Sequence, residues 1–114
     1  MYIKGNKMTK KYKVITLCGS TKYKEDFLKV QKDLTLKGNI VLSVGLFSHS
    51  EEDILSQETK EMLNDIHKRK IDMSDEIFVI NVNGYIGEST KSEIEYALKT
   101  NKKINYLEPN KKRA

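Results

Sequence analysis

The stretch that decides the fold is Val14-Ile15-Thr16-Leu17-Cys18-Gly19-Ser20. It begins with an apolar, β-branched run, which is typical of a strand buried on both faces, and Gly19-Ser20 predicts a turn at the end of that strand. Three further apolar runs follow in the chain, at residues 40–44, 76–80 and 103–107. We therefore expect four buried strands.

Segments with a helical spacing of apolar residues separate these strands, at residues 22–37, 57–73 and 90–100. Residues 45–56 are polar and irregular, and we predict a loop there. Apolar strands that alternate with helices are typical of a parallel sheet covered on both faces. The sequence therefore predicts a three-layer α/β/α domain of the flavodoxin or Rossmann type, with a four- to five-stranded parallel sheet.

The length of 114 residues fits one domain. We expect a disordered leader at residues 1–11, a single domain at residues 12–109 and a basic tail at residues 110–114. The chain has one cysteine, Cys18, and no Cys/His cluster with zinc spacing, which argues against a disulfide scaffold and a zinc module.

The positive net charge of +5 comes from the two ends of the chain. Seven of the 21 basic residues lie in the predicted leader and tail, which leaves 14 basic residues against all 16 acids in the domain. A nucleic-acid-binding protein concentrates positive charge on one face of its fold, so we expect no nucleic-acid partner. The sequence has no long apolar segment and no secretory signal, so we predict a cytoplasmic protein without a membrane partner.

Three segments should meet at the candidate site, because ligands of open parallel sheets bind outside the carboxyl ends of the strands. These segments are residues 19–22, 45–50 and 81–89. In the first of them, Gly19 permits close approach of a ligand, while Ser20 and Thr21 add hydroxyl groups at a helix N-terminus. This pattern suits a phosphate or a sugar hydroxyl, but it also fits a turn whose hydroxyl only caps the helix.

The stretch from Gly84 to Glu93 contains two glycines, several hydroxyl residues and a carboxylate at the start of a helix. Thr90 and Glu93 have the spacing of a capping box, in which the carboxylate would only accept a backbone hydrogen bond. The alternative is a nucleophilic carboxylate held at the crevice, of the kind that forms covalent glycosyl intermediates. His67 borders the apolar stripe of the second helix, where it is either a packing residue or a proton donor and acceptor.

Over residues 13–107 the chain resembles the nucleoside 2-deoxyribosyltransferase superfamily, and in particular its 2'-deoxynucleoside 5'-monophosphate N-glycosidases. Leu17-Cys18-Gly19-Ser20 is similar to the phosphate-side loop of that branch, and Ser92-Glu93-Ile94-Glu95-Tyr96-Ala97 is similar to its nucleophile motif. The resemblance implies that Glu93 is the catalytic nucleophile.

The resemblance also implies a role for His67, which stands eight residues before Asp75, where the family usually has an acid. His67 would assist the departing base. Thr16 stands where the family has a tyrosine, and Glu95 stands where it has a glycine. The implied substrate-binding residues are Cys18, Gly19, Ser20, Thr21, Asp75, Gly84, Gly87 and Ser89.

These residues together predict cleavage of a nucleoside or nucleotide N-glycosidic bond, or deoxyribosyl transfer, through a covalent glycosyl-glutamate. The resemblance implies no metal or redox cofactor, and it implies a homo-oligomer, since relatives are dimers or larger. Two alternatives stay open. In the first, the chain would be a non-catalytic nucleotide-sensing module that uses the same crevice. In the second, it would be a structural component that contacts a partner through its second helix.

Overall fold

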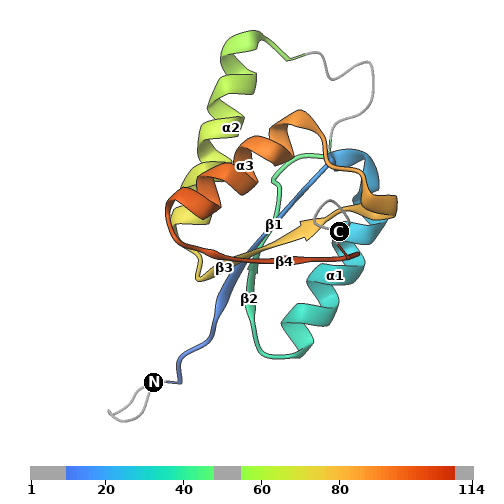
Figure 1. Cartoon of the computed structure of the whole chain (residues 1–114), viewed down its shortest axis with the longest axis vertical. Coiled ribbons are helices and arrows are strands. Elements are labelled where there is room, and N and C mark those ends of the chain that lie inside the picture. Colours follow the sequence, from blue (N-terminus) through green and yellow to red (C-terminus); the bar gives the residue numbers. More distant parts are fainter. Residues whose placement is uncertain (1–9, 48–54, 110–114) are drawn as a thin grey trace.

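A computed structural model describes residues 10–47 and 55–109 of the chain. The predicted tail and most of the predicted leader lie outside the described residues, as does part of the predicted loop at residues 45–56. The strands and longer helices, labelled in Figure 1, occur in the order β1 (Val14–Gly19), α1 (Lys24–Leu36), β2 (Ile40–Leu42), α2 (Gln57–Asp72), β3 (Glu76–Ile80), α3 (Glu88–Lys99) and β4 (Lys103–Tyr106). Two short 3-10 turns, Thr21–Tyr23 and Val82–Gly84, follow β1 and β3.

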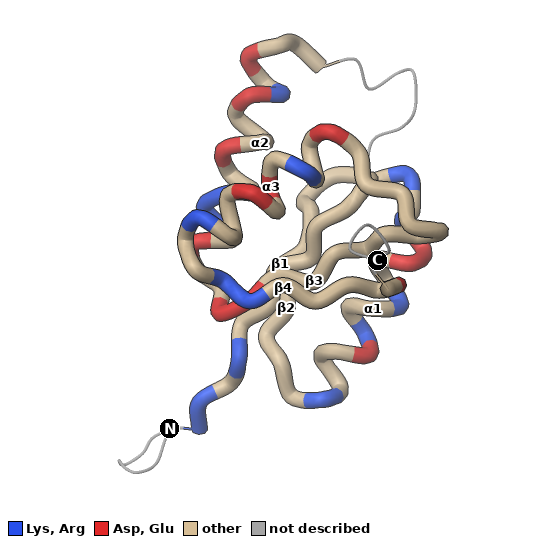
Figure 2. The backbone as a smooth tube through the Cα atoms, viewed as in Figure 1, with Lys and Arg blue, Asp and Glu red and all other residues tan. Residues whose placement is uncertain are grey.

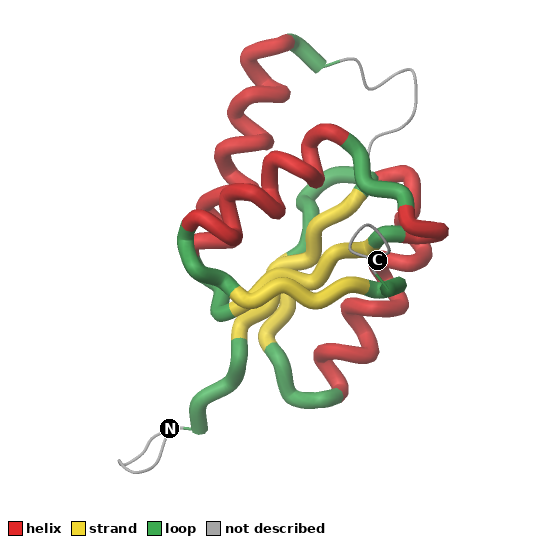
Figure 3. Tube along the Cα trace, viewed as in Figure 1, coloured by secondary structure: helices red, strands yellow, loops and turns green. Residues whose placement is uncertain are grey.

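The four strands form one parallel sheet in the order β2-β1-β3-β4. Figure 3 shows this sheet at the centre, with α1 on one side and α2 and α3 on the other. The predicted three-layer α/β/α class is thereby confirmed. The strand order reverses between β1 and β3, whose carboxyl ends pair through Gly19 and Ile80. This reversal is where a parallel sheet opens a crevice for ligands.

Two apolar clusters hold the layers together, one on each face of the sheet. Leu17 of β1 packs with Phe27 and Val30 of α1 on one face. The next residue, Cys18, points to the opposite face, where it packs with Ile71 of α2 and Ala97 of α3. Because successive strand residues face opposite sides, the apolar run of β1 supplies both cores at once.

Three element boundaries differ by two residues from the predicted ones. α1 begins at Lys24, two residues late, because residues 21–23 form a 3-10 turn. β2 ends at Leu42, two residues early, and the next carbonyl, that of Ser43, accepts a hydrogen bond of 2.7 Å from Nζ of Lys70. α3 begins at Glu88, two residues early, because extended Gly87 serves as its N-cap and its carbonyl accepts the first helical hydrogen bond, from the backbone N–H of Lys91.

The surface charges of the described part are mixed in sign. Figure 2 shows acidic and basic residues interspersed along the helices. Within residues 10–47 and 55–109, no helix combines the length and the apolar character that crossing a bilayer requires.

Candidate functional site

A pocket of about 640 Å³ opens at the carboxyl ends of β1 and β3. Its wall contains residues 19–21 after β1, residues 44–46 after β2 and residues 85 and 87–89 after β3. The described parts of the three segments predicted to converge therefore meet in one place. Residues 48–50 of the second segment lie outside the described residues. The volume suits a small organic ligand of nucleotide size.

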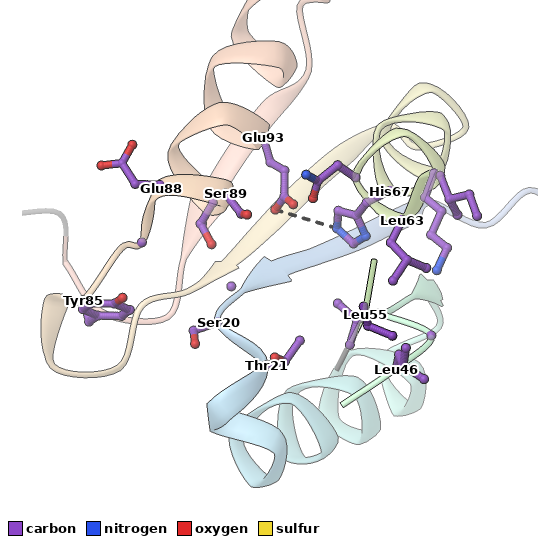
Figure 4. A pocket seen from close by; sticks show the side chains of 18 residues that line it. Ser20, Thr21, Leu46, Leu55, Leu63, His67, Tyr85, Glu88, Ser89 and Glu93 are labelled. Carbon is purple, nitrogen blue, oxygen red and sulfur yellow. Dashed lines mark ion pairs between the residues drawn. The ribbon is translucent and has the colours of Figure 1, made fainter. Parts of the chain in front are cut away.

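Gly19 and Ser20 form one polar side of the pocket (Figure 4). A side chain at position 19 would place its Cβ only 2.9 Å from the carbonyl oxygen of Ile80, so the approach of β1 to β3 requires glycine there. The Ser20 hydroxyl accepts a hydrogen bond of 3.3 Å from the backbone N–H of Lys22. Ser20 therefore is a cap, as one reading of the sequence allowed, and also lines the pocket.

The N-terminus of α3 forms the facing polar side, with Gly87, Ser89 and Thr90 in the wall. No side chain caps this helix. Because the first backbone N–H groups of a helix have no partner within the helix, this end can receive a phosphate or another anion.

The opposite side of the pocket is apolar. It is formed by side chains that follow β2 or lie on α2 and just before it, namely Val44, Leu46, Leu55, Leu63 and Ile66. A ligand with one polar and one apolar part therefore matches the two halves of the pocket better than a uniformly charged one.

Glu93 projects from the second turn of α3 into the wall of the pocket, between its polar side and His67 (Figure 4). Its side chain is 12% exposed. Burial raises the pKa of this carboxyl to about 7, while a hydrogen bond with the Cys18 thiol and the charge of Lys68 act in the opposite direction. The predicted capping box is wrong, because Thr90 lies inside α3 rather than at its N-cap. The carboxylate therefore faces the pocket without a capping role.

His67 lies on α2 against the end of β1, and it is buried. Its Nε2 is 3.0 Å from the carbonyl oxygen of Leu17. A carbonyl only accepts hydrogen bonds, so Nε2 carries the proton of the neutral ring. Burial and, to a smaller extent, the charge of Lys70 lower the pKa of His67 to about 4, against the hydrogen bond to Leu17.

The dashed line in Figure 4 joins Nε2 of His67 to Oε1 of Glu93, which are 3.9 Å apart. Since the imidazole is neutral at pH 7, this contact is a polar approach rather than a salt bridge. His67 is thus both a packing residue and a part of the pocket wall.

Cys18 lies behind these two side chains. Its Sγ is 3.6 Å from Nε2 of His67, and the residue is fully buried. Burial raises the pKa of the thiol, and the neighbouring Glu93 carboxylate raises it further. Cys18 therefore contacts His67 and Glu93 and does not itself line the pocket, contrary to the predicted substrate contact.

Of the predicted substrate-binding residues, the pocket contains Gly19, Ser20, Thr21, Gly87 and Ser89. Gly84 is absent from its wall. Asp75 precedes β3 at the amino ends of the strands, on the opposite side of the sheet from the pocket opening. There its carboxylate accepts a hydrogen bond of 2.8 Å from the backbone N–H of Val14. The structure thereby corrects the assignment of Asp75, which holds two strands in register.

Thr16 also lies away from the pocket. Its hydroxyl donates to the carbonyl of Lys70 and contacts the Ser74 hydroxyl, so it does not reach Glu93 as a tyrosine at the site would have to.

Several pocket residues were not predicted from the sequence. Tyr85 lines the pocket between the two glycines of its loop, and an aromatic residue in such a loop was the available signal. Asn64 and Lys70 line it from α2. Each of them lies three residues, about one helical turn, from His67. This spacing predicts a pocket contact only once the side of α2 that carries His67 is known to face the pocket.

No protein-family model matches the chain, and no curated protein matches its sequence. The geometry of the pocket and the motif resemblance are therefore the grounds for assigning a function.

Proposed function

We propose that this protein cleaves the N-glycosidic bond of a deoxynucleoside or of its 5'-monophosphate, with Glu93 as the nucleophile. The observation that carries the proposal is the place of the Glu93 carboxylate. It lies largely buried in the wall of a nucleotide-sized pocket, with hydroxyl groups and a helix N-terminus on one side and an apolar wall on the other.

In the proposed reaction a carboxylate oxygen of Glu93 attacks the anomeric carbon of the sugar. The C–N bond breaks, its electron pair leaves with the base, and a glycosyl ester on Glu93 remains. Water then attacks the same carbon, releases the sugar and restores the carboxylate. A second base in place of water would give deoxyribosyl transfer. Because the pKa of Glu93 is about 7, a substantial fraction of the nucleophile is ionised at neutral pH.

The two sides of the pocket suit the two parts of a nucleotide. In this reaction the base would lie against the apolar wall that contains Leu63 and Ile66. The sugar hydroxyl and any 5'-phosphate then lie between Ser20 and the start of α3, where hydroxyl and backbone N–H groups can donate hydrogen bonds.

The structure supports a positioning role for His67 rather than the acid role that the resemblance implied. A ring with a pKa of about 4 is neutral at pH 7, and the proton on its Nε2 is held by the Leu17 carbonyl. His67 thereby shields one side of the Glu93 carboxylate from water. The proton that the departing base takes up is assigned to solvent.

The test is incubation of the purified protein with a panel of deoxynucleosides and their 5'-monophosphates, with free base measured by chromatography. We expect base release by the wild type and none by Glu93→Gln. The matched control is Glu95→Gln, which removes an exposed carboxylate from the same helix. Ligand-induced thermal shifts without any base release would instead favour the nucleotide-sensing module.

The homo-oligomer stays a prediction. Figure 1 shows that the N-terminal end of α2 extends well beyond the sheet. Met62 and Ile66, one turn apart on this helix, are 52% and 40% exposed. Light scattering on the full chain would measure the mass in solution, and Met62→Lys together with Ile66→Lys should reduce it if this side is the contact.

A further inference from the structure

We propose that Cys18, His67 and Glu93 form a binding site for a divalent transition-metal cation of the zinc type. The three residues come from three different elements, β1, α2 and α3, so no local spacing motif in the sequence predicts the cluster. Their ligand atoms, Sγ, Nε2 and a carboxylate oxygen, all lie within 4.8 Å of one another.

The separations between the ligand atoms are close to those that one small ion imposes. A tetrahedral zinc ion with bonds of about 2.3 Å to sulfur and about 2.0 Å to nitrogen holds these two atoms about 3.5 Å apart. Sγ of Cys18 and Nε2 of His67 are 3.6 Å apart. The same geometry places nitrogen and oxygen about 3.4 Å apart. Nε2 of His67 and Oε1 of Glu93 are 3.9 Å apart, so a side-chain movement of about half an ångström brings this pair to the same separation.

The kind of ligand atom selects the kind of metal. A thiolate, an imidazole nitrogen and a single carboxylate oxygen suit zinc, cobalt and related ions. Magnesium and calcium require mostly oxygen ligands, which this cluster does not supply. The site is therefore expected to discriminate strongly against both of these abundant ions.

The position of the cluster leaves one side open to a fourth ligand. His67 and Glu93 line the pocket, whereas Cys18 lies behind them. An ion held by all three would therefore meet the pocket on its remaining side, where water or a ligand atom can complete a tetrahedron. Three protein ligands and one open position is the arrangement of many catalytic zinc sites, whereas structural sites are closed by four.

Binding requires protons to leave or move. The Cys18 thiol and the protonated fraction of the Glu93 carboxyl lose their protons to solvent. His67 exchanges the Nε2 hydrogen bond to Leu17 for the metal, with its ring proton then on Nδ1. The resulting charges favour the complex, since a thiolate and a carboxylate balance a divalent cation. Without a cation, burial instead raises the pKa of both acids, which keeps them partly or wholly protonated.

The site and the proposed reaction share Glu93. A bound ion would occupy the carboxylate that attacks the sugar, so metal binding and base release should exclude each other. The metal site itself does not depend on the proposed function, because its test reads the ion directly and needs no substrate.

The experiment is a titration of the reduced full-length protein with Co²⁺, followed by absorption spectroscopy. We expect a thiolate-to-cobalt charge-transfer band in the near ultraviolet, together with the strong visible bands of a tetrahedral site, saturating at one ion per chain. Zn²⁺ should remove both signals by displacement. Cys18 is the only cysteine of the chain, so a thiolate band at this stoichiometry reports on it alone.

Three variants locate the site. Cys18→Ser should abolish the charge-transfer band. His67→Gln and Glu93→Gln should each weaken Co²⁺ binding by at least about tenfold, because the loss of even an outer-shell partner of a metal ligand costs about that much. Glu95→Gln, which changes an exposed carboxylate on the same helix as Glu93, is the control and should leave binding unchanged.

A second measurement covers the case in which a core variant fails to fold. Zn²⁺ should raise the unfolding temperature of the wild type and of Glu95→Gln, and Mg²⁺ should not. Saturation without a thiolate band, a band that survives in Cys18→Ser, or loss of binding in Glu95→Gln would each overturn the proposal.

Discussion

His67 and Glu93 approach to 3.9 Å at the wall of the pocket, yet the usual order of their pKa values is inverted. Burial raises the pKa of Glu93 to about 7 and lowers the pKa of His67 to about 4. Neutral forms of both groups are therefore favoured over the ion pair. A carboxyl that titrates near neutral pH, beside a histidine that stays uncharged, has the properties of a reactive group rather than of a structural salt bridge.

The first prediction concerns the nucleophile. Glu93→Gln should lower the rate of base release by at least about 10³-fold, because a carboxamide cannot form the glycosyl ester. Its thermal stability at pH 8 should equal or exceed that of the wild type, since the variant removes a buried charge and keeps the shape. Initial rates and thermal unfolding check this. A rate that falls only in proportion to the folded fraction would make the role of Glu93 structural.

The second prediction concerns the dependence of stability on pH. The pKa of Glu93 in the folded chain, about 7, lies above its ordinary value of 4.5, so its protonated form stabilises the fold. In His67→Gln, this group should make the free energy of unfolding fall as pH rises from about 4.5 to about 7.

The opposite sign is expected for the histidine. The pKa of His67 in the folded chain, about 4, lies below 6.5, so its neutral form stabilises the fold. In Glu93→Gln, the free energy of unfolding should therefore rise with pH from about 4 to 6.5. Each slope approaches at most about 1.4 kcal/mol per pH unit. Urea unfolding of both variants at several pH values gives the difference between their slopes, in which shared contributions cancel. Parallel curves would contradict the inverted pKa values.

The third prediction concerns the Cys18 thiol. Its hydrogen bond to the Glu93 carboxylate lowers the pKa of that group, against the effect of burial. Base release should increase with pH with an inflection near 7, and Cys18→Ala should move the inflection upward. Cys18→Ser keeps a donor and should restore most of the shift. A pH–rate profile that is the same in all three proteins would remove the thiol from this role.

The fourth prediction concerns the close approach of β1 to β3. Gly19→Ala would place a Cβ 2.9 Å from the backbone oxygen of Ile80, which cannot move without disturbing the sheet. We expect a loss of roughly 1–3 kcal/mol in the free energy of unfolding. Gly45→Ala is the matched control, because its Cβ would meet nothing within 4 Å. Equal stabilities of the two variants in chemical denaturation would show that β1 and β3 can separate there.

The sequence by itself determined the class of fold. Apolar runs such as residues 14–18 and 76–80 are local signals, and their alternation with helical segments leaves few arrangements other than a covered parallel sheet. The three segments of the pocket also followed from the sequence, because the carboxyl ends of parallel strands share one edge. The start of α3 did not, since the Thr90–Glu93 spacing suggested a cap at Thr90, whereas the N-cap is Gly87.

Only the tertiary structure decided the chemistry of the site. Cys18, His67 and Glu93 are far apart in the chain, and their contact depends on how α2 and α3 pack on β1. Asp75, which the motif resemblance placed with them, lies instead at the amino ends of the strands, away from the pocket. The protonation states of Glu93 and His67 follow from burial, and burial arises from the packing of the whole domain rather than from neighbouring residues in the chain.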